Sequence, residues 1–341
     1  MYKWLYEHFL SKMDPEKAHR RACRLLKIAQ RSKFCRKTMS KEVPQDKRLN
    51  VSLCDIKFPN PLGMAAGFDK YGTLSLGLGA LGFGFVETGT VTLHPRKGNI
   101  KPRIWREDNK CLRNFMGLPS PGCEVFRRNL ILYKSGVVGV SLSTIGDNDA
   151  LQDHERFHVL YNEIKECADY FTINISCPNV EHMINVELML STLSLIRHYE
   201  ELYKKPRVPV FLKFGPIDVK GLKEIVLMAV DYGVDGFIAT NTLPGEKPGG
   251  LSGPCLKRYG IATVKTLYKY IGKTLPIIGV GGISDCKDVL DYIKSGASLV
   301  QLYTSFVYEG PRLPRQILQG LLKDSDENGW GSITDLIGVD V

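Results

Sequence analysis

The sequence predicts an α/β fold, a closed (β/α)8 TIM barrel with a small N-terminal helical extension. Eight short apolar runs, rich in Val, Ile and Phe, each end in small polar residues. They span residues 61–66, 83–88, 137–142, 170–175, 209–214, 235–240, 275–280 and 299–303. Stretches with helical spacing separate most of them, which is typical of parallel strands buried on both faces. A barrel of this kind carries its chemistry at the carboxyl ends of its strands.

Length and composition favour one barrel with an appendage over two equal domains. The chain has 341 residues, of which 43% are hydrophobic and 24% charged. We expect residues 1–48 to form the extension and residues 49–341 the barrel. No apolar run approaches the roughly 18 residues of a membrane-spanning helix, and we see no secretory signal. Nine scattered cysteines without zinc-ligand spacing predict reduced thiols and no metal site.

The net charge of +10 belongs almost entirely to the extension. Residues 1–48 hold 14 Lys or Arg and five Asp or Glu, a balance of +9 that leaves +1 for the barrel. Asp14 followed by Pro15 is a typical helix start. Apolar and basic residues recur with helical spacing on both sides of it, so we expect two short amphipathic helices joined near Asp14.

Three interpretations of this basic extension are open from its residues. Its apolar face could lie in a membrane interface, or it could pack on the barrel, and the pattern favours neither over the other. Nucleic-acid binding is the weakest of the three, because the segment lacks an exposed aromatic platform or a base-reading helix.

Two strand ends indicate an anionic ligand. Gly281 and Gly282 follow the seventh strand, where barrels commonly bind phosphate, although a simple tight turn is the alternative. Lys213 lies inside an apolar run, so its ammonium must point into the barrel mouth and meet an anionic partner there. It could form a Schiff base or stabilise an anionic cofactor.

Other strand ends offer polar and small side chains. Asn174 and Asn241 provide paired donors and acceptors, as an amide-rich planar ligand would require. The small residues Ala66 and Gly67 would let a flat ring lie against the backbone. Cys177 could act as a nucleophile or base, or be a small buried residue, and no histidine near it in sequence supports a Cys–His dyad.

Taken in order, these stretches resemble the dihydroorotate dehydrogenases, the FMN enzymes of pyrimidine synthesis. The similarity lies in residues 60–70, 82–92, 240–242, 249–253, 276–282 and 296–304. Met1, Tyr2 and residues 10–19 are similar to the extension of the membrane-associated, quinone-reducing class, which favours membrane contact for the extension.

The resemblance implies a role for each matching residue. The FMN site would comprise Ala66, Gly67, Thr90, Ser141, Asn174, Lys213, Thr240, Gly253, Gly282, Tyr303 and Thr304. Lys70 would bind the carboxylate of dihydroorotate or orotate, and its ring amides would contact Asn114, Asn174, Asn179, Asn241 and Thr242. Cys177 would remove a proton from one ring carbon while its neighbour gives a hydride to the flavin. Lys213 would place positive charge beside the reduced flavin.

The implied function is oxidation of dihydroorotate to orotate with a membrane quinone as acceptor. The protein would be cytoplasmic and peripheral on the inner membrane, and would bind no nucleic acid. This chain departs from the family pattern in having Cys177 where the quinone class has serine, Ser141 in place of an asparagine, and an altered substrate loop over residues 114–119. Three alternatives therefore stay open: a soluble type using fumarate or NAD, a non-catalytic flavin-binding barrel, and a phosphate-binding barrel without flavin.

Overall fold

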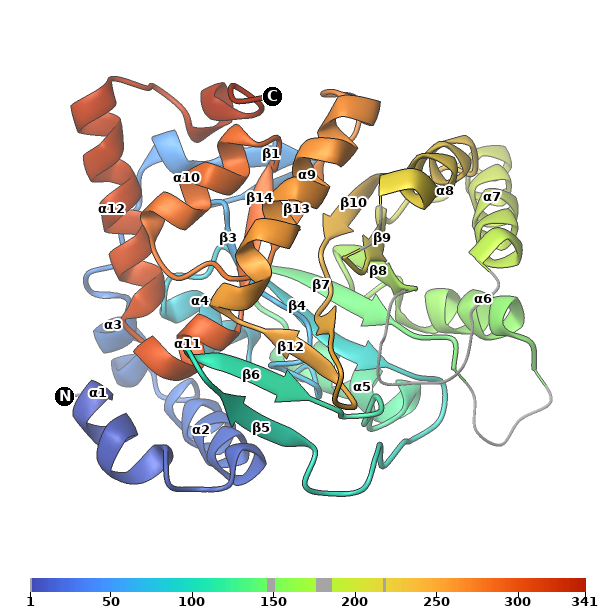
Figure 1. The fold of residues 1–341 in the computed structure, drawn as a ribbon. Helices are drawn as coiled ribbons and strands as arrows, with labels where there is room; N and C mark the ends of the chain where they lie inside the picture. Colours follow the sequence, from blue (N-terminus) through green and yellow to red (C-terminus); the bar gives the residue numbers. More distant parts are fainter. Residues whose placement is uncertain (1, 146–150, 176–185, 217–218) are drawn as a thin grey trace.

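The structure is a computed structural model, which describes residues 2–145, 151–175, 186–216 and 219–341. Eight parallel strands close into a barrel, as predicted, and pair in sequence order until the last meets the first (Figure 1). The strands are β3 (Leu62–Met64), β4 (Phe85–Val91), β7 (Val137–Leu142), β8 (Tyr170–Asn174), β9 (Val210–Phe214), β10 (Gly236–Ala239), β13 (Ile277–Val280) and β14 (Leu299–Leu302). Each falls within or beside one of the eight apolar runs.

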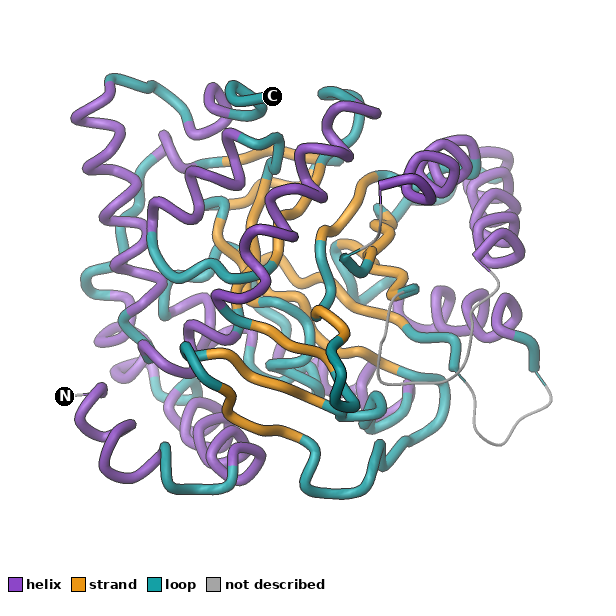
Figure 2. The backbone as a smooth tube through the Cα atoms, viewed as in Figure 1, coloured by secondary structure: helices purple, strands orange, loops and turns teal. Residues whose placement is uncertain are grey.

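Helices surround the barrel on its outer side (Figure 2). They are α4 (Ser75–Ala80), α5 (Cys123–Tyr133), α6 (Asp153–Ile164), α7 (Val186–Leu202), α8 (Val219–Asp231), α9 (Lys257–Ile271), α10 (Cys286–Lys294), α11 (Thr304–Glu309) and α12 (Leu313–Asn328). Some of them start at a side-chain cap. The carboxylate of Asp285, for example, accepts the backbone N–H of Asp288 at 2.9 Å and so begins α10.

Aromatic rings fill the barrel interior where neighbouring strands carry glycine. A Cβ at Gly63 would lie 2.3 Å from the ring of Phe85, and one at Gly139 would lie 2.0 Å from the ring of Tyr170. Both rings are almost completely buried. A larger residue at either glycine would therefore overpack the core.

An antiparallel sheet that the sequence analysis did not predict lies beside the mouth of the barrel. It consists of β5 (Ile104–Glu107), β6 (Cys111–Asn114), β12 (Gly250–Ser252) and β11 (Leu243–Pro244). Residues 249–253, whose three glycines are more typical of a loop, mostly form β12, which pairs with β6. A separate hairpin, β1 (Val51–Leu53) with β2 (Ile56–Phe58), precedes the barrel.

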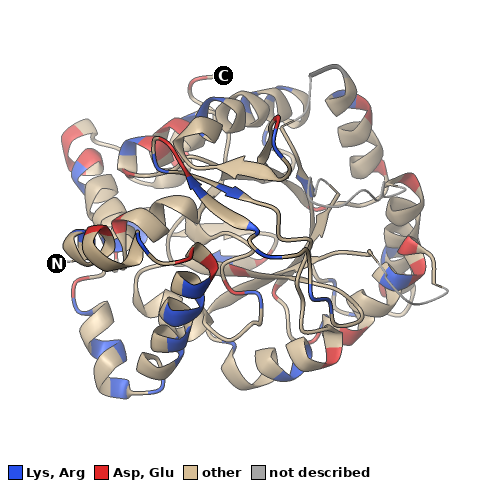
Figure 3. Ribbon diagram, turned by 60° about the horizontal axis from the view of Figure 1, so that its bottom comes forward, with Lys and Arg blue, Asp and Glu red and all other residues tan. Residues whose placement is uncertain are grey.

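The N-terminal extension contains three helical segments rather than the expected two. The first is α1 (Tyr2–Leu5), which continues as a π-helical turn over Tyr6–Leu10. The second, α2 (Pro15–Ala29), begins as predicted, because the carboxylate of Asp14 accepts the N–H of Lys17 at 2.8 Å. The third, α3 (Lys33–Ser40), was missed because it is short and is capped only by Ser32. Basic residues recur along these helices (Figure 3).

Candidate active site

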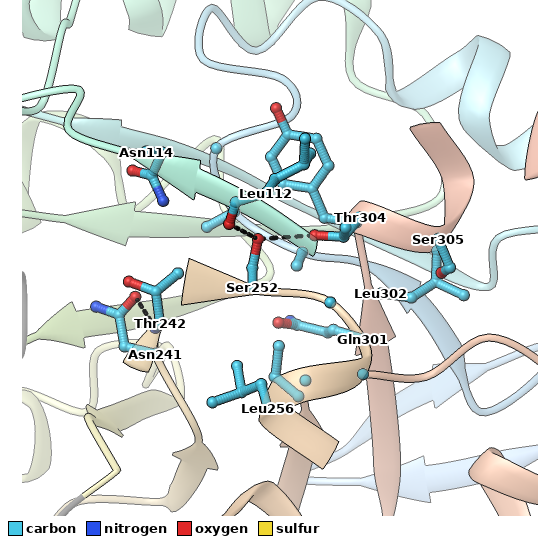
Figure 4. A pocket seen from close by; sticks show the side chains of 18 of the residues that line it. Leu112, Asn114, Asn241, Thr242, Ser252, Leu256, Gln301, Leu302, Thr304 and Ser305 are labelled. Carbon is cyan, nitrogen blue, oxygen red and sulfur yellow. Dashed lines mark hydrogen bonds between the residues drawn. The ribbon is translucent and has the colours of Figure 1, made fainter. Parts of the chain in front are cut away.

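A cavity of ≈ 490 Å³ opens at the carboxyl ends of the barrel strands, beside the antiparallel sheet. Figure 4 shows part of its lining, with side chains from both sheets pointing into one space. The structure brings most of the predicted site residues together here. Those that line it are Ala66, Gly67, Lys70, Thr90, Asn114, Asn174, Lys213, Thr240, Asn241, Thr242, Gly253, Gly282, Tyr303 and Thr304.

Of the predicted residues that the structure describes, Ser141 is the one outside that lining. Ser141 is fully buried and lies behind the wall, with its hydroxyl 2.9 Å from the hydroxyl of Thr90. Its contact with the lining is this hydrogen bond to Thr90. Cys177 and Asn179 lie outside the described residues. Both come shortly after Asn174, which ends β8 and lines the cavity.

Lys213 has the anionic partner that its buried position required. Its side chain is 7% exposed, and its Nζ lies 3.7 Å from Oε1 of Glu87, whose side chain is completely buried. The sequence analysis missed Glu87. The same signal that drew attention to Lys213 could have found it, because a carboxylate inside the apolar run of β4 also needs a partner.

Lys70 is held at the cavity edge by the turn that follows β3. Its Nζ donates to the carbonyl of Gly67, and burial lowers the pKa of its ammonium below the usual value. The neighbouring Asp69 carboxylate accepts the backbone N–H groups of Thr73 at 3.1 Å and Leu74 at 2.8 Å. These bonds fix the turn that presents Lys70 to the cavity.

The cavity asparagines are arranged through their own hydrogen bonds. The amide nitrogen of Asn241 lies 3.3 Å from the amide oxygen of Asn174, and the backbone N–H of Thr242 donates to Asn241 Oδ1 at 2.8 Å. Asn114 donates to the carbonyl of Gly250 at 3.3 Å, across the ladder between β6 and β12. Amide groups on two walls therefore face the same space (Figure 4).

The loops after β12 and β13 expose backbone to the cavity. Gly282 has φ +71°, and a Cβ there would lie 2.7 Å from the side chain of Lys257. Gly253 has φ +111°, and a Cβ there would lie 2.8 Å from the carbonyl of Lys110. Only glycine fits either position without strain, which leaves the backbone open to close approach by a ligand.

Two buried polar atoms in the lining have no hydrogen-bond partner within the described part of the chain. They are Oγ of Ser305 and Oε1 of Gln301. Buried polar atoms in proteins are normally satisfied. The open glycine backbone and the buried Lys213 fit a ligand that has a phosphate and a polar ring, as FMN does.

A second, mainly apolar cavity of ≈ 240 Å³ lies between the extension and the barrel. Residues of α1, α2 and α11 line it, and Ile104, Leu112 and Tyr303 line both cavities. The sequence analysis did not identify this second cavity, because it exists only where two distant parts of the chain meet.

Two polar side chains, His19 and Arg106, line this apolar cavity. Burial, reinforced by the nearby charge of Lys70, lowers the pKa of His19 to about 3, so its ring is neutral near pH 7. The guanidinium of Arg106 donates to the carbonyls of Leu10 at 2.7 Å and Met13 at 2.8 Å, which fastens the extension to β5. The cavity thus has an apolar body with a few polar contacts.

The outward side of the extension carries large apolar side chains. Trp4, Phe9, Ile28 and Phe34 are all more than half exposed, and Phe34 reaches 79%. The extension therefore packs on the barrel with one set of apolar residues and presents another set outward. Among the helices that the structure describes, none combines the length and apolarity needed to cross a membrane.

The fold and cavity define a (β/α)8 barrel with a ligand site at the carboxyl ends of its strands. The chain belongs to the dihydroorotate dehydrogenase family, whose model matches residues 48–324. The resemblance found in the sequence motifs is thereby confirmed.

Known relatives match nearly the whole chain. The dihydroorotate dehydrogenase (quinone) of Helicobacter acinonychis (strain Sheeba) is 35% identical over 355 residues, which cover 99% of each protein. The enzyme of that name from Chelativorans sp. (strain BNC1) is 36% identical and covers 95% of this chain and 92% of its own. The structure of the Eimeria tenella dihydroorotate dehydrogenase in complex with ferulenol superposes with a TM-score of 0.82 at 29% identity and covers 96% of each chain.

Proposed function

We propose that the protein oxidises dihydroorotate to orotate with bound FMN and passes the electrons to a quinone. The observation that carries this proposal is the pair of cavities with a shared wall. One holds most of the predicted substrate and flavin residues, and the other is mainly apolar. Ile104, Leu112 and Tyr303 separate them, so a flavin edge at this wall would be near both an oxidisable substrate and a quinone.

The cavity residues would divide the binding of FMN among them. The backbone at Gly253 and Gly282 would hold the phosphate. Ala66 and Gly67 would lie against the flat ring, and Lys213 would stand beside it as a positive charge. When bound, the flavin supplies a hydride acceptor.

The substrate would be oriented by charge and by amides. The ammonium of Lys70 would pair with the carboxylate, while Asn114, Asn174, Asn241 and Thr242 would contact the ring amides. The sequence further suggests Asn179 as a ring contact and Cys177 as the base that takes the proton from the ring carbon. The thiolate of Cys177 would have to form first, so the rate would rise with pH through the pKa of this thiol.

The extension, residues 1–48, would give quinone access, and residues 49–341 would form the flavin-binding barrel. Exposed aromatic and aliphatic residues beside many cations suit a segment that rests in a membrane interface. A quinone could then pass from the lipid between α1 and α2 into the apolar cavity. The protein would lie peripherally on the cytoplasmic side of the inner membrane.

The visible spectrum of the purified protein tests this function. Dihydroorotate should bleach the flavin absorbance, and an added quinone should restore it, whereas fumarate and NAD should not. Reoxidation by fumarate or NAD alone would indicate a soluble-type enzyme. An intact FMN complex that dihydroorotate does not bleach would indicate a non-catalytic barrel. A colourless protein that cannot be reconstituted with FMN would exclude a flavin site.

Filling the apolar cavity should impair reoxidation of the flavin by quinone without impairing its reduction by dihydroorotate, the two half-reactions of the enzyme. Ala18 lines this cavity from α2, so Ala18→Leu should raise the KM for quinone about tenfold, on the scale of one to three kcal/mol for a misfitting group in an apolar pocket. Bleaching of the flavin by dihydroorotate should be unchanged. Stopped-flow measurement of each half-reaction would show the difference.

Ala29→Leu is the matched control, because it adds the same atoms to the last residue of α2, outside the cavity lining. It should leave both half-reactions near the parent rates. Equal loss of quinone reduction in both variants would contradict the assignment of this cavity to the quinone.

A further inference from the structure

The carboxylate of Glu87 lies inside the barrel, behind the residues that line the main cavity. Its side chain is completely buried. Its Oε2 accepts hydrogen bonds from Tyr170 Oη at 3.3 Å, Thr172 Oγ1 at 3.1 Å and Gln301 Nε2 at 2.8 Å. Three donors on one oxygen form a site built for a carboxylate.

The other carboxylate oxygen faces the cavity floor. Oε1 of Glu87 lies 3.7 Å from Nζ of Lys213 and accepts no hydrogen bond from any described residue. Lys213 and Gln301 line the cavity, whereas Glu87 does not. Glu87 therefore acts on a bound molecule from one layer below, through the lysine and the glutamine.

The three donors around Oε2 are neutral, so the formal countercharge in this cluster comes from Lys213. A buried carboxylate is costly unless it is both paired and hydrogen-bonded, and here it is both. Opposite charges this close interact strongly in a protein interior. The negative charge of Glu87 must then offset part of the positive field that Lys213 projects into the cavity.

We propose that Glu87 is a positioning residue that holds Lys213 at the cavity floor and lowers the reduction potential of the bound flavin. The inference rests on the proposed FMN site. Positive charge beside a flavin favours added electrons, and Glu87 reduces that preference. A lower potential lets electrons leave more readily toward the acceptor in the apolar cavity.

Glu87→Gln tests the inference, because it removes the charge with little change of shape. We expect the equilibrium between oxidised and reduced FMN to shift at least tenfold toward the reduced form. For a two-electron couple this is a rise of about 30 mV in midpoint potential. The potential would be measured against a dye of known potential. The rate of flavin reoxidation by quinone should fall more than the rate of flavin bleaching by dihydroorotate.

Tyr170→Phe is the companion variant, since it removes one donor to Oε2 but keeps the ring and the charge of Glu87. Because the carboxylate is then less well neutralised, the potential should fall. This variant also decides the question if Glu87→Gln does not fold. A rise in potential after Tyr170→Phe, or no rise after Glu87→Gln, would overturn the inference.

The parent protein distinguishes this inference from the proposed function. If the parent binds no FMN, or its FMN is not bleached by dihydroorotate, the proposed function fails, and the role of Glu87 fails with it. If the parent is bleached and reoxidised by quinone but Glu87→Gln has the parent potential, only the role of Glu87 is wrong.

Discussion

Cys177→Ala is expected to slow bleaching of the flavin by dihydroorotate by about 10²–10⁴-fold, the usual contribution of a positioned base. The expectation comes from the family resemblance, which implies that Cys177 is the base; it lies three residues after Asn174, which ends β8 and lines the cavity. Binding of orotate should change little, because the thiol acts on a proton and the ring amides are held elsewhere. Anaerobic stopped-flow absorbance of the FMN complex measures both quantities.

Cys177→Ser should retain part of the activity with a more alkaline pH dependence. A thiol ordinarily titrates near pKa ~8.5, and an alcohol is a far weaker acid, so the serine variant needs a higher pH to release its proton. Cys167→Ala is a matched control, because its partly buried thiol packs against the hydrophobic core away from the cavity lining. If Cys177→Ala bleached as fast as Cys167→Ala, the base would have to be another group.

The sequence predicted the barrel because parallel strands leave a strong local signal. Each strand is a continuous apolar run that ends in small polar residues. Strands such as β8 and β9 are buried, so most of their side chains must be apolar. The site followed from the same rule, because all strand ends of such a barrel meet at one rim. Lys213 was recognisable because an ammonium inside an apolar run is costly to bury unless it reaches an anionic partner.

Features formed by distant segments left no comparable signal. The strand β12 is only three residues long and exists because β6 pairs with it, so glycines 249, 250 and 253 resembled a loop. The apolar cavity forms only where the extension docks on the barrel, with Arg106 of β5 bonded to the carbonyls of Leu10 and Met13. From the residues alone, packing on the barrel and membrane contact were alternatives for the extension. In the structure one set of its apolar residues packs on the barrel and another set is exposed, so the two are compatible.

Lys70→Met is expected to weaken binding of dihydroorotate at least 30-fold, since losing one partner of a buried charge pair costs about 2 kcal/mol or more. In the parent, the ammonium must be protonated to bind a carboxylate. Because burial lowers the pKa of Lys70, affinity should decline as the pH rises toward that lowered pKa. The variant should lack this decline. Titration of the flavin spectrum with orotate at several pH values measures both effects.

Lys110→Met is the matched control for the loss of charge at the same cavity. Lys110 also lines it, but its side chain is 61% exposed and its Nζ is paired with Glu309 at 2.7 Å. An exposed pair of this kind contributes little, so orotate affinity should stay within about threefold of the parent. If both variants lost the same orotate affinity, the orotate carboxylate would be attracted by the overall positive charge of the cavity and not by one lysine. If only Lys70→Met lost orotate affinity, the orotate carboxylate would be bound by the ammonium of Lys70.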